Sequence, residues 1–163
     1  MTAARLPLLD AATAAFIEGG VSINVSSRDA NKTPSMARVV GCRVSTDRKS
    51  LTVLVPRSRA AELLDSIAFC HQIAVVFSEP STHRTIQLKG TDASIVPVET
   101  SDARLNERFA DAFVAEVCPL GFEEELVRSL VSCAVEDLTA VKFSPSLAFH
   151  QTPGPRAGEP LKS

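Results

Sequence analysis

The sequence contains no tyrosine and no tryptophan among its 163 residues, so its only aromatic side chains other than histidine are eight phenylalanines. Proteins that bind single-stranded nucleic acid stack the bases on aromatic side chains along a basic groove. Here the basic residues form no run and are not interleaved with aromatic residues. Both absences argue against a nucleic-acid partner.

Cysteine and histidine are sparse and scattered. No two of the four cysteines have the Cys-x-x-Cys spacing that is typical of zinc sites and redox dithiols. No two of the three histidines are four residues apart, as metal-binding pairs on a helix are. We therefore predict no metal site and interpret the cysteines as buried, reduced thiols. The residues concerned are Cys42, Cys70, Cys118, Cys133, His71, His83 and His150.

Long apolar segments are also missing. The run Ile73–Phe77 is typical of the longest in the chain, far short of the roughly 20 residues that span a membrane. Asp10 interrupts the apolar N-terminal segment, so we predict no signal peptide and expect a cytoplasmic protein without a membrane partner. The composition, 45% hydrophobic and 22% charged, is that of a soluble globular protein, and the length favours a single domain.

Positive charge is concentrated in the first part of the chain. Residues 1–60 contain nine Lys and Arg against four Asp and Glu, whereas the remainder contains eight against fifteen. This asymmetry predicts an anionic ligand near the first part of the chain.

Alternating and helical apolar patterns predict the secondary structure. Val21, Ile23 and Val25 alternate with polar residues, as in a half-buried strand. Ser58 is a candidate N-cap for a helix that ends near Cys70. A β-bulge at Gly41 would turn Arg38 and Arg43 to one side of their strand. The further elements are helices at about 7–18, 102–116 and from Glu123, a hairpin turn at 47–50, and strands at 34–44, 51–55, 73–77, 84–98 and 138–149, the last interrupted by Pro145.

This order of elements predicts an α+β fold. Five or six strands follow one another through short links, and the helices are set apart from them, which favours an antiparallel sheet or small barrel. We expect one domain over residues 1–150. Residues 151–163, rich in proline and glycine, are expected to form an extended C-terminal arm.

Four arginines in the first part of the chain are the best candidates for binding an anion: Arg38, Arg43, Arg57 and Arg59. A guanidinium group binds a phosphate through two parallel, charge-assisted hydrogen bonds. The residues after Ser58 would also present free backbone amides at a helix start. The alternative, which the spacing leaves open, is that all four are solvated surface residues.

Three segments resemble motifs of the pyridoxamine 5′-phosphate oxidase-like family of flavin-binding split barrels. Arg38-Val-Val-Gly-Cys-Arg43 resembles the Arg-x-Val-x-x-Lys strand of that family, and Pro56-Arg-Ser-Arg59 resembles its Ser-Arg-Lys segment. Phe77-Ser-Glu-Pro80, followed by Arg84-Thr-Ile-Gln-Leu-Lys-Gly90, resembles its Glu-Pro and Arg-Gln-Val-x-Val-x-Gly strand. The three segments occur in the family's order, and the match covers about residues 9–98.

The resemblance implies a six-stranded antiparallel split β-barrel with peripheral helices. It also implies flavin mononucleotide (FMN) as the cofactor and a homodimer whose ligand sites lie at the interface. The first two segments would hold the FMN phosphate, and Thr85 would face the flavin ring. The residues implied to bind FMN are Arg38, Val39, Arg43, Ser58, Arg59 and Thr85.

The chain departs from the family pattern at several positions. Ala60 and Arg43 stand where the family has lysine, and Thr85 stands where it has glutamine. The C-terminal segment with which the true oxidase recognises its substrate has no counterpart, since the chain ends in Gln151-Thr-Pro-Gly-Pro-Arg-Ala-Gly158 and a few further residues. These departures indicate a divergent member rather than the oxidase itself.

Three functional hypotheses follow. The first is an FMN-dependent oxidoreductase with a small-molecule substrate, in which the flavin carries the chemistry and no catalytic side chain need be visible. The second is a non-catalytic protein on the same fold that binds flavin, haem or another ligand. The third is a structural dimer without a ligand. Turnover of bound flavin by an electron donor distinguishes the first from the others.

Overall fold

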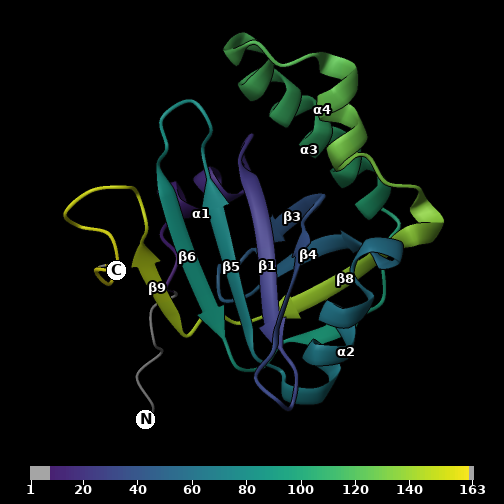
Figure 1. Cartoon of the computed structure of the whole chain (residues 1–163), viewed down its shortest axis with the longest axis vertical. Helices are drawn as coiled ribbons and strands as arrows, with labels where there is room; N and C mark the ends of the chain where they lie inside the picture. Colours follow the sequence, from purple (N-terminus) through teal and green to yellow (C-terminus); the bar gives the residue numbers. More distant parts are fainter. Residues whose placement is uncertain (1–7, 162–163) are drawn as a thin grey trace.

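The computed structural model describes residues 8–161, which form two antiparallel β-sheets with helices at their margins (Figure 1). Sheet A has the strand order β2-β1-β5-β6-β9 and sheet B the order β3-β4-β8-β7. The strands of sheet A are β1 (Ser22–Arg28), β2 (Pro34–Arg38), β5 (Ile73–Ser78), β6 (Thr85–Gly90) and β9 (Leu147–His150). Those of sheet B are β3 (Gly41–Val44), β4 (Leu51–Pro56), β7 (Ser94–Val96) and β8 (Leu138–Phe143).

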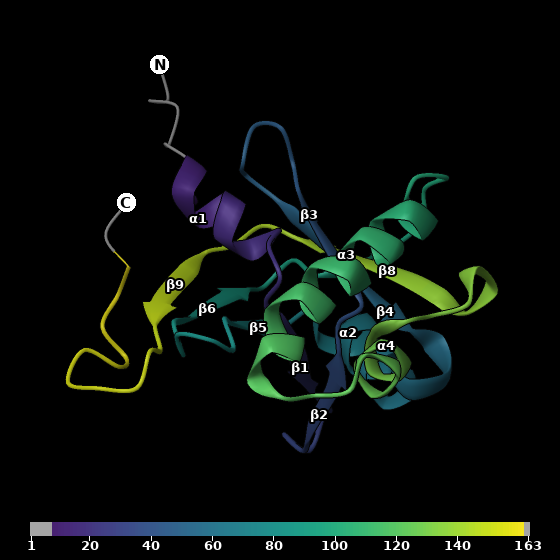
Figure 2. The same cartoon turned by 90° about the horizontal axis from the view of Figure 1, so that it is seen from above.

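Four α-helices surround the sheets: α1 (Ala11–Ile17), α2 (Ala61–Cys70), α3 (Asp102–Val117) and α4 (Glu124–Val131). Asp10 caps α1, since its Oδ1 accepts a hydrogen bond of 2.7 Å from the Thr13 amide. Figures 1 and 2 together place α1 on the side of sheet A that faces sheet B. Three short 3₁₀ turns complete the structure: η1 (Arg57–Arg59), η2 (Cys118–Leu120) and η3 (Val135–Asp137). None of the described helices is long and apolar enough to cross a membrane.

The chain passes from one sheet to the other at the Val39–Val40 step. The Val39 amide donates to the Ile23 carbonyl of sheet A at 2.9 Å, and the Val40 amide donates to the Leu54 carbonyl of sheet B at 2.8 Å. Both side chains are fully buried, so the hydrophobic core is continuous where the chain passes from one sheet to the other. Similar passages connect β6 with β7 and β8 with β9.

The main core lies between the two sheets and consists of their inward-pointing side chains. Burial alternates along β1 and β5 because only one face of each strand is covered, although β5 is apolar at nearly every position, whereas every residue of the central strand β4 is buried. A smaller cluster under α3 contains Val40, Leu54, Leu138 and Ala140.

The α+β class and the antiparallel pairing are confirmed, but the predicted count of six strands is not: the described residues form nine strands in two sheets. The strands expected at 34–44 and 84–98 are each divided between sheets A and B. The bulge expected at Gly41 is therefore wrong, since Arg38 and Arg43 belong to different sheets. The N-cap expected at Ser58 is also wrong, because α2 begins at Ala61.

The C-terminal residues 151–161 fold back on β9 instead of extending away from it. Phe149 and Pro160 form an antiparallel bridge, and the Leu161 amide donates to the Ala148 carbonyl at 2.9 Å. Leu161 packs partly buried against the core. This segment therefore covers the outer edge of β9.

Gly20 lies where α3 approaches the start of β1. A Cβ atom at Gly20 would stand 2.5 Å from the backbone oxygen of Ala112, a distance that requires the helix to move. We expect Gly20→Ala to lower the free energy of unfolding by about 1–3 kcal/mol, as overpacking against the backbone does. Urea denaturation measures the change. Gly19→Ala is the matched control, because its Cβ would meet backbone oxygens only at 3.4 and 3.5 Å; an equal loss in both variants would contradict the packing argument.

Candidate functional site

The six residues implied to bind FMN lie in three places. Arg38, Val39 and Thr85 belong to sheet A or its end, Arg43 lies on β3 of sheet B, and Ser58 and Arg59 lie on η1. The Val39 side chain is fully buried and its amide is used by the sheet, so it contributes only backbone to any site.

The η1 turn binds an oxyanion from the chain itself. The Asp137 carboxylate accepts a hydrogen bond from the Ser58 amide at 2.8 Å and another from the Ser58 hydroxyl at 2.5 Å. Asp137 reaches Ser58 from η3, 79 residues further along the chain. The η1 turn thus presents an amide, a hydroxyl and nearby arginines to an oxyanion, and a carboxylate fills it; the amide is that of Ser58 itself and not, as predicted, one of the residues after it.

The charges around Asp137 favour its ionised form. The hydrogen bonds from the Ser58 hydroxyl and amide lower the pKa of Asp137 below its usual value, and the positive charges of Arg59 and Arg57 lower it further. Arg57 Nε donates to the Thr139 hydroxyl at 3.3 Å, and Arg59 Nη2 donates to the Ser132 carbonyl at 3.4 Å. Neither guanidinium is within ion-pair distance of a carboxylate among the described residues, so both keep a full positive charge next to the η1 turn.

Arg38 begins a row of polar side chains that crosses the face of sheet A turned away from sheet B. Arg38 Nη1 donates to the Ser22 hydroxyl at 3.1 Å, and Ser22 pairs in register with Ser78 on β5. The Ser78 hydroxyl is hydrogen-bonded to that of Thr85 on β6. Since the Thr85 hydroxyl donates to the His83 carbonyl at 2.9 Å, Ser78 is the donor to Thr85.

This outward face of sheet A lacks a covering helix among residues 8–161 (Figure 1). Its central side chains are small and half-buried, namely Asn24, Ser26, Ala74 and Val76.

The chain enters the β3–β4 hairpin just after Arg38 and leaves it at the η1 turn, and both points lie at the open end of the hairpin. Gly41 pairs with Leu54 on β4, so the chain just before β3 and the chain just after β4 emerge together, away from the hairpin turn. Arg43 pairs with Thr52 and therefore lies towards the turn. The backbone at Arg38 therefore enters the hairpin at the end where the η1 turn leaves it, whereas Arg43 lies towards the other end.

The charge of Arg43 is neutralised by two carboxylates at the start of α3. Its Nε donates to Asp102 Oδ1 at 3.1 Å, and its Nη2 lies 2.9 Å from Glu99 Oε1. Asp102 is completely buried and also accepts from the Glu99 amide at 2.8 Å. Arg43 therefore holds α3 against β3, and two of its three guanidinium nitrogens are engaged by carboxylates.

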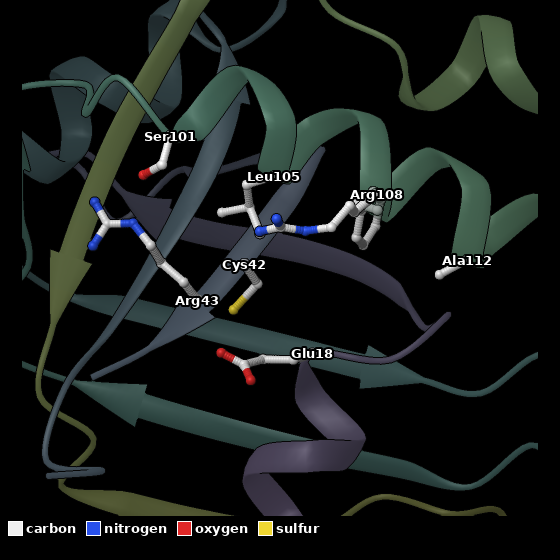
Figure 3. Close-up of a pocket in the computed structure, with 8 residues that line it drawn as sticks. Glu18, Cys42, Arg43, Ser101, Leu105, Arg108 and Ala112 are labelled. Carbon is white, nitrogen blue, oxygen red and sulfur yellow. The ribbon is translucent and has the colours of Figure 1, made fainter. Parts of the chain in front are cut away.

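A cleft of about 410 Å³ lies between α3, β3 and the end of α1 (Figure 3). The Glu18 carboxylate and the Arg108 guanidinium flank it, and Cys42 lies at its base (Figure 3). Glu18 accepts a hydrogen bond of 2.7 Å from the Val44 amide, which ties α1 to β3. Burial raises the pKa of the Cys42 thiol far above its usual value, with a further contribution from Glu18, so Cys42 stays protonated and unreactive.

Sequence reasoning identified the η1 turn and Arg38 but missed Asp137, Ser22 and Ser78. Ser22 was detectable as a polar residue of a predicted strand, whereas Ser78 lies one residue beyond the strand predicted at 73–77, and the partners of both depend on the strand pairing. No feature of the local sequence marks Asp137 as part of the site, because its hydrogen bonds to Ser58 depend on the contact between η3 and η1 in the folded protein.

The donors at η1 fit a phosphate group. A phosphate oxygen accepts the same hydrogen bonds as the Asp137 carboxylate, and Arg57 and Arg59 supply the charge that a dianion requires. Ala60, which replaces the family lysine, is buried and adds no donor other than its backbone.

No protein-family model and no curated protein matches this chain. Solved structures do match it. HupZ of Group A Streptococcus is 13% identical, with a TM-score of 0.54 over 92% of this chain and 99% of its own. A protein described as F420 reductase is 13% identical, with a TM-score of 0.51 over 82% of this chain and 93% of its own. A putative pyridoxamine 5′-phosphate oxidase from Lactobacillus delbrueckii is 12% identical, with a TM-score of 0.50 over 86% and 93%.

At these identities the likeness shows the fold alone. The chain has the fold of the pyridoxamine 5′-phosphate oxidase-like proteins, as the three sequence motifs predicted. The likeness extends over nearly the whole length of the chains compared.

Proposed function

We propose that this protein binds FMN and acts as an oxidoreductase of the pyridoxamine 5′-phosphate oxidase-like type on a small-molecule substrate. The proposal rests on one observation: the Ser58 amide and hydroxyl of the η1 turn both donate hydrogen bonds to a carboxylate, and Arg57 and Arg59 lie beside it. The fold shared with a putative pyridoxamine 5′-phosphate oxidase and an F420 reductase supports it. The proposal includes a cytoplasmic homodimer with its ligand sites at the interface and no nucleic-acid or membrane partner.

In this proposal each group of residues has a separate task. Ser58 and Arg59 hold the phosphate, and Arg38, at the same end of the hairpin, adds a second guanidinium. The row that ends at Thr85 lies beside the ring on the outward face of sheet A. FMN, when bound, supplies hydride and electron transfer. The chain's residues bind and orient it, and no catalytic side chain is assigned.

Donor turnover tests the oxidoreductase proposal. Protein loaded with FMN is mixed anaerobically with a reduced nicotinamide nucleotide, and the loss of the flavin absorption band is followed. Reduction that continues over many turnovers when a soluble acceptor is added supports an enzyme. Stable binding of FMN without reduction by any donor class would leave a binding protein and reject the oxidoreductase.

A non-catalytic binding protein for flavin, haem or another anionic ligand is the second candidate function. The filled state of η1 favours a ligand other than FMN, such as haem, because Asp137 already satisfies the donors that a phosphate needs. The neutralised state of Arg43 favours it too. A haem spectrum after incubation with haemin, in place of a flavin spectrum after incubation with FMN, would support this candidate.

Asp137 must move aside before a phosphate can bind at η1. If η1 is open in about a tenth of the molecules, the apparent dissociation constant is weakened about tenfold. We therefore expect Asp137→Ala and Asp137→Asn to strengthen FMN binding about tenfold, measured by flavin fluorescence titration. Asp92→Asn is the matched control, because Asp92 also accepts a hydrogen bond from a backbone amide, that of Ser144, at 2.8 Å. Weaker binding in both Asp137 variants would show that Asp137 shapes the site and does not compete for it.

A further inference from the structure

Helix α4 leaves an apolar stripe in solvent. Leu126 and Leu130 lie four residues apart on α4 and are 56% and 43% exposed, and Phe122, two residues before the helix begins, is 54% exposed. The adjacent residues Val127 and Val131 are buried. Helix α4 therefore buries one apolar face in the core and exposes further apolar side chains to solvent. We call these three exposed residues the α4 stripe. Contiguous exposed apolar side chains of this kind mark interaction sites.

The outward face of sheet A is a second surface with exposed apolar side chains. Strand pairing places Met36, Ser26, Ala74, Lys89 and Leu147 in one row across all five strands. Met36 at one end is 70% exposed and Leu147 at the other is 52% exposed. Between them lie the small residues Ser26 and Ala74 and, next to Leu147, Lys89, whose ammonium group lies 5.3 Å from the centre of the Phe149 ring.

The two surfaces carry opposite charge. The outward positions of sheet A include Arg28, Arg38 and Lys89 and no acidic residue. The α4 stripe is adjoined by Glu123, Glu124 and Glu125, and the single arginine of α4, Arg128, is engaged by Glu124 and Asp111 at 2.7 and 2.9 Å. Pairing either surface with its own copy would bring like charges together, whereas pairing one with the other brings opposite charges together.

We propose that the α4 stripe of one copy docks on the outward face of sheet A of a second copy, and that a two-fold axis makes the contact reciprocal. The α3–α4 pair lies at the margin of the molecule, to one side of sheet A and reaching past the ends of its strands (Figure 1), and the stripe residues are exposed to solvent. A two-fold axis gives two equal contacts and closes the assembly at the dimer. The inference rests on the homodimer of the proposed function but does not require flavin.

Charge placed in the stripe tests the contact. We expect the wild-type protein to be a dimer by sedimentation equilibrium, and Leu126→Asp to raise the dimer dissociation constant at least ~30-fold, as loss of an interface hot spot does. Ile95→Asp is the control, since Ile95 is 47% exposed on β7 of sheet B, outside both surfaces. Circular dichroism checks that both variants fold.

Charge reversal gives a second, independent readout. Glu123→Lys with Glu125→Lys, and separately Arg28→Glu with Lys89→Glu, should each weaken the dimer, and the protein with all four changes should recover it. A dimer that is indifferent to Leu126→Asp and to both reversals would overturn this docking while leaving the homodimer of the proposed function intact. A wild-type monomer would overturn both.

Discussion

Replacing Arg38 and Arg59 together by alanine is expected to weaken FMN binding at least ~100-fold. Each guanidinium would make a charge-assisted hydrogen bond to the phosphate, and each such bond contributes about 1.5–3 kcal/mol. Both residues lie at the end of the β3–β4 hairpin where the η1 turn emerges. Riboflavin, which has no phosphate, should bind the variant and the wild type almost equally. Fluorescence titration with both flavins measures the difference.

The control for this variant is Lys49→Ala with Arg104→Ala, which removes the same charge from exposed positions. It should leave the affinity for FMN within about twofold, since surface charges distant from the ligand are screened by salt. If the double variant Arg38→Ala, Arg59→Ala binds FMN as tightly as the wild type, the phosphate site is not at η1 and the assignment of these residues fails.

Replacing Asn106 by alanine is expected to lower the free energy of unfolding by about 3 kcal/mol. Asn106 is buried on α3, and its Nδ2 donates to the Val40 carbonyl at 2.7 Å and to the Val131 carbonyl at 2.8 Å. Its Oδ1 accepts from the Cys133 amide at 3.2 Å. Alanine would leave buried backbone groups without partners, at a cost of about 1–3 kcal/mol each. Urea denaturation should show a lower midpoint with an unchanged slope.

Asn31→Ala serves as the comparison for Asn106, because Asn31 is exposed in the turn between β1 and β2. Its effect should stay within about 0.5 kcal/mol, as for most surface substitutions. A loss below about 1 kcal/mol for Asn106→Ala would mean that water replaces the amide and that α3 does not depend on this residue.

Much of the fold was predictable from the sequence because apolar alternation marks a half-buried strand such as β1, a continuous β-branched and aromatic run marks a strand such as β5, and helical apolar spacing marks α3. The strands β1, β4 and β5 and the helix α3 appear close to their predicted bounds. The passages between sheets were not predictable. Val39 and Val40 are both apolar, and nothing in the sequence distinguishes a strand that continues from one that changes sheets between them.

The candidate site was predictable only in part. Local sequence identified the donors of the η1 turn, since Ser58 and its flanking arginines are adjacent in the chain. It could not identify Asp137, which fills those donors from a distant segment, or the carboxylates of Glu99 and Asp102, which neutralise Arg43. Long-range partners of charged groups depend on tertiary structure, and these are the partners that decide whether a charge is available to a ligand.

The occupation of the η1 turn by the Asp137 carboxylate bears on both candidate functions. A carboxylate held by Ser58 keeps the turn ordered and keeps the charge of Arg57 and Arg59 partly balanced without a ligand. A phosphate that displaced it would carry more charge and accept more hydrogen bonds, which favours exchange. If Asp137 is not displaced, the same turn is only a structural contact between η1 and η3.

The most direct test of the account is the visible absorption spectrum of the purified protein after incubation with FMN and desalting, with riboflavin in parallel. The account predicts a flavin band that is retained after FMN and lost after riboflavin, because the phosphate supplies most of the binding. A colourless protein after both incubations would contradict the flavin proposal and leave only the fold. Equal retention of both flavins would contradict the phosphate site at η1.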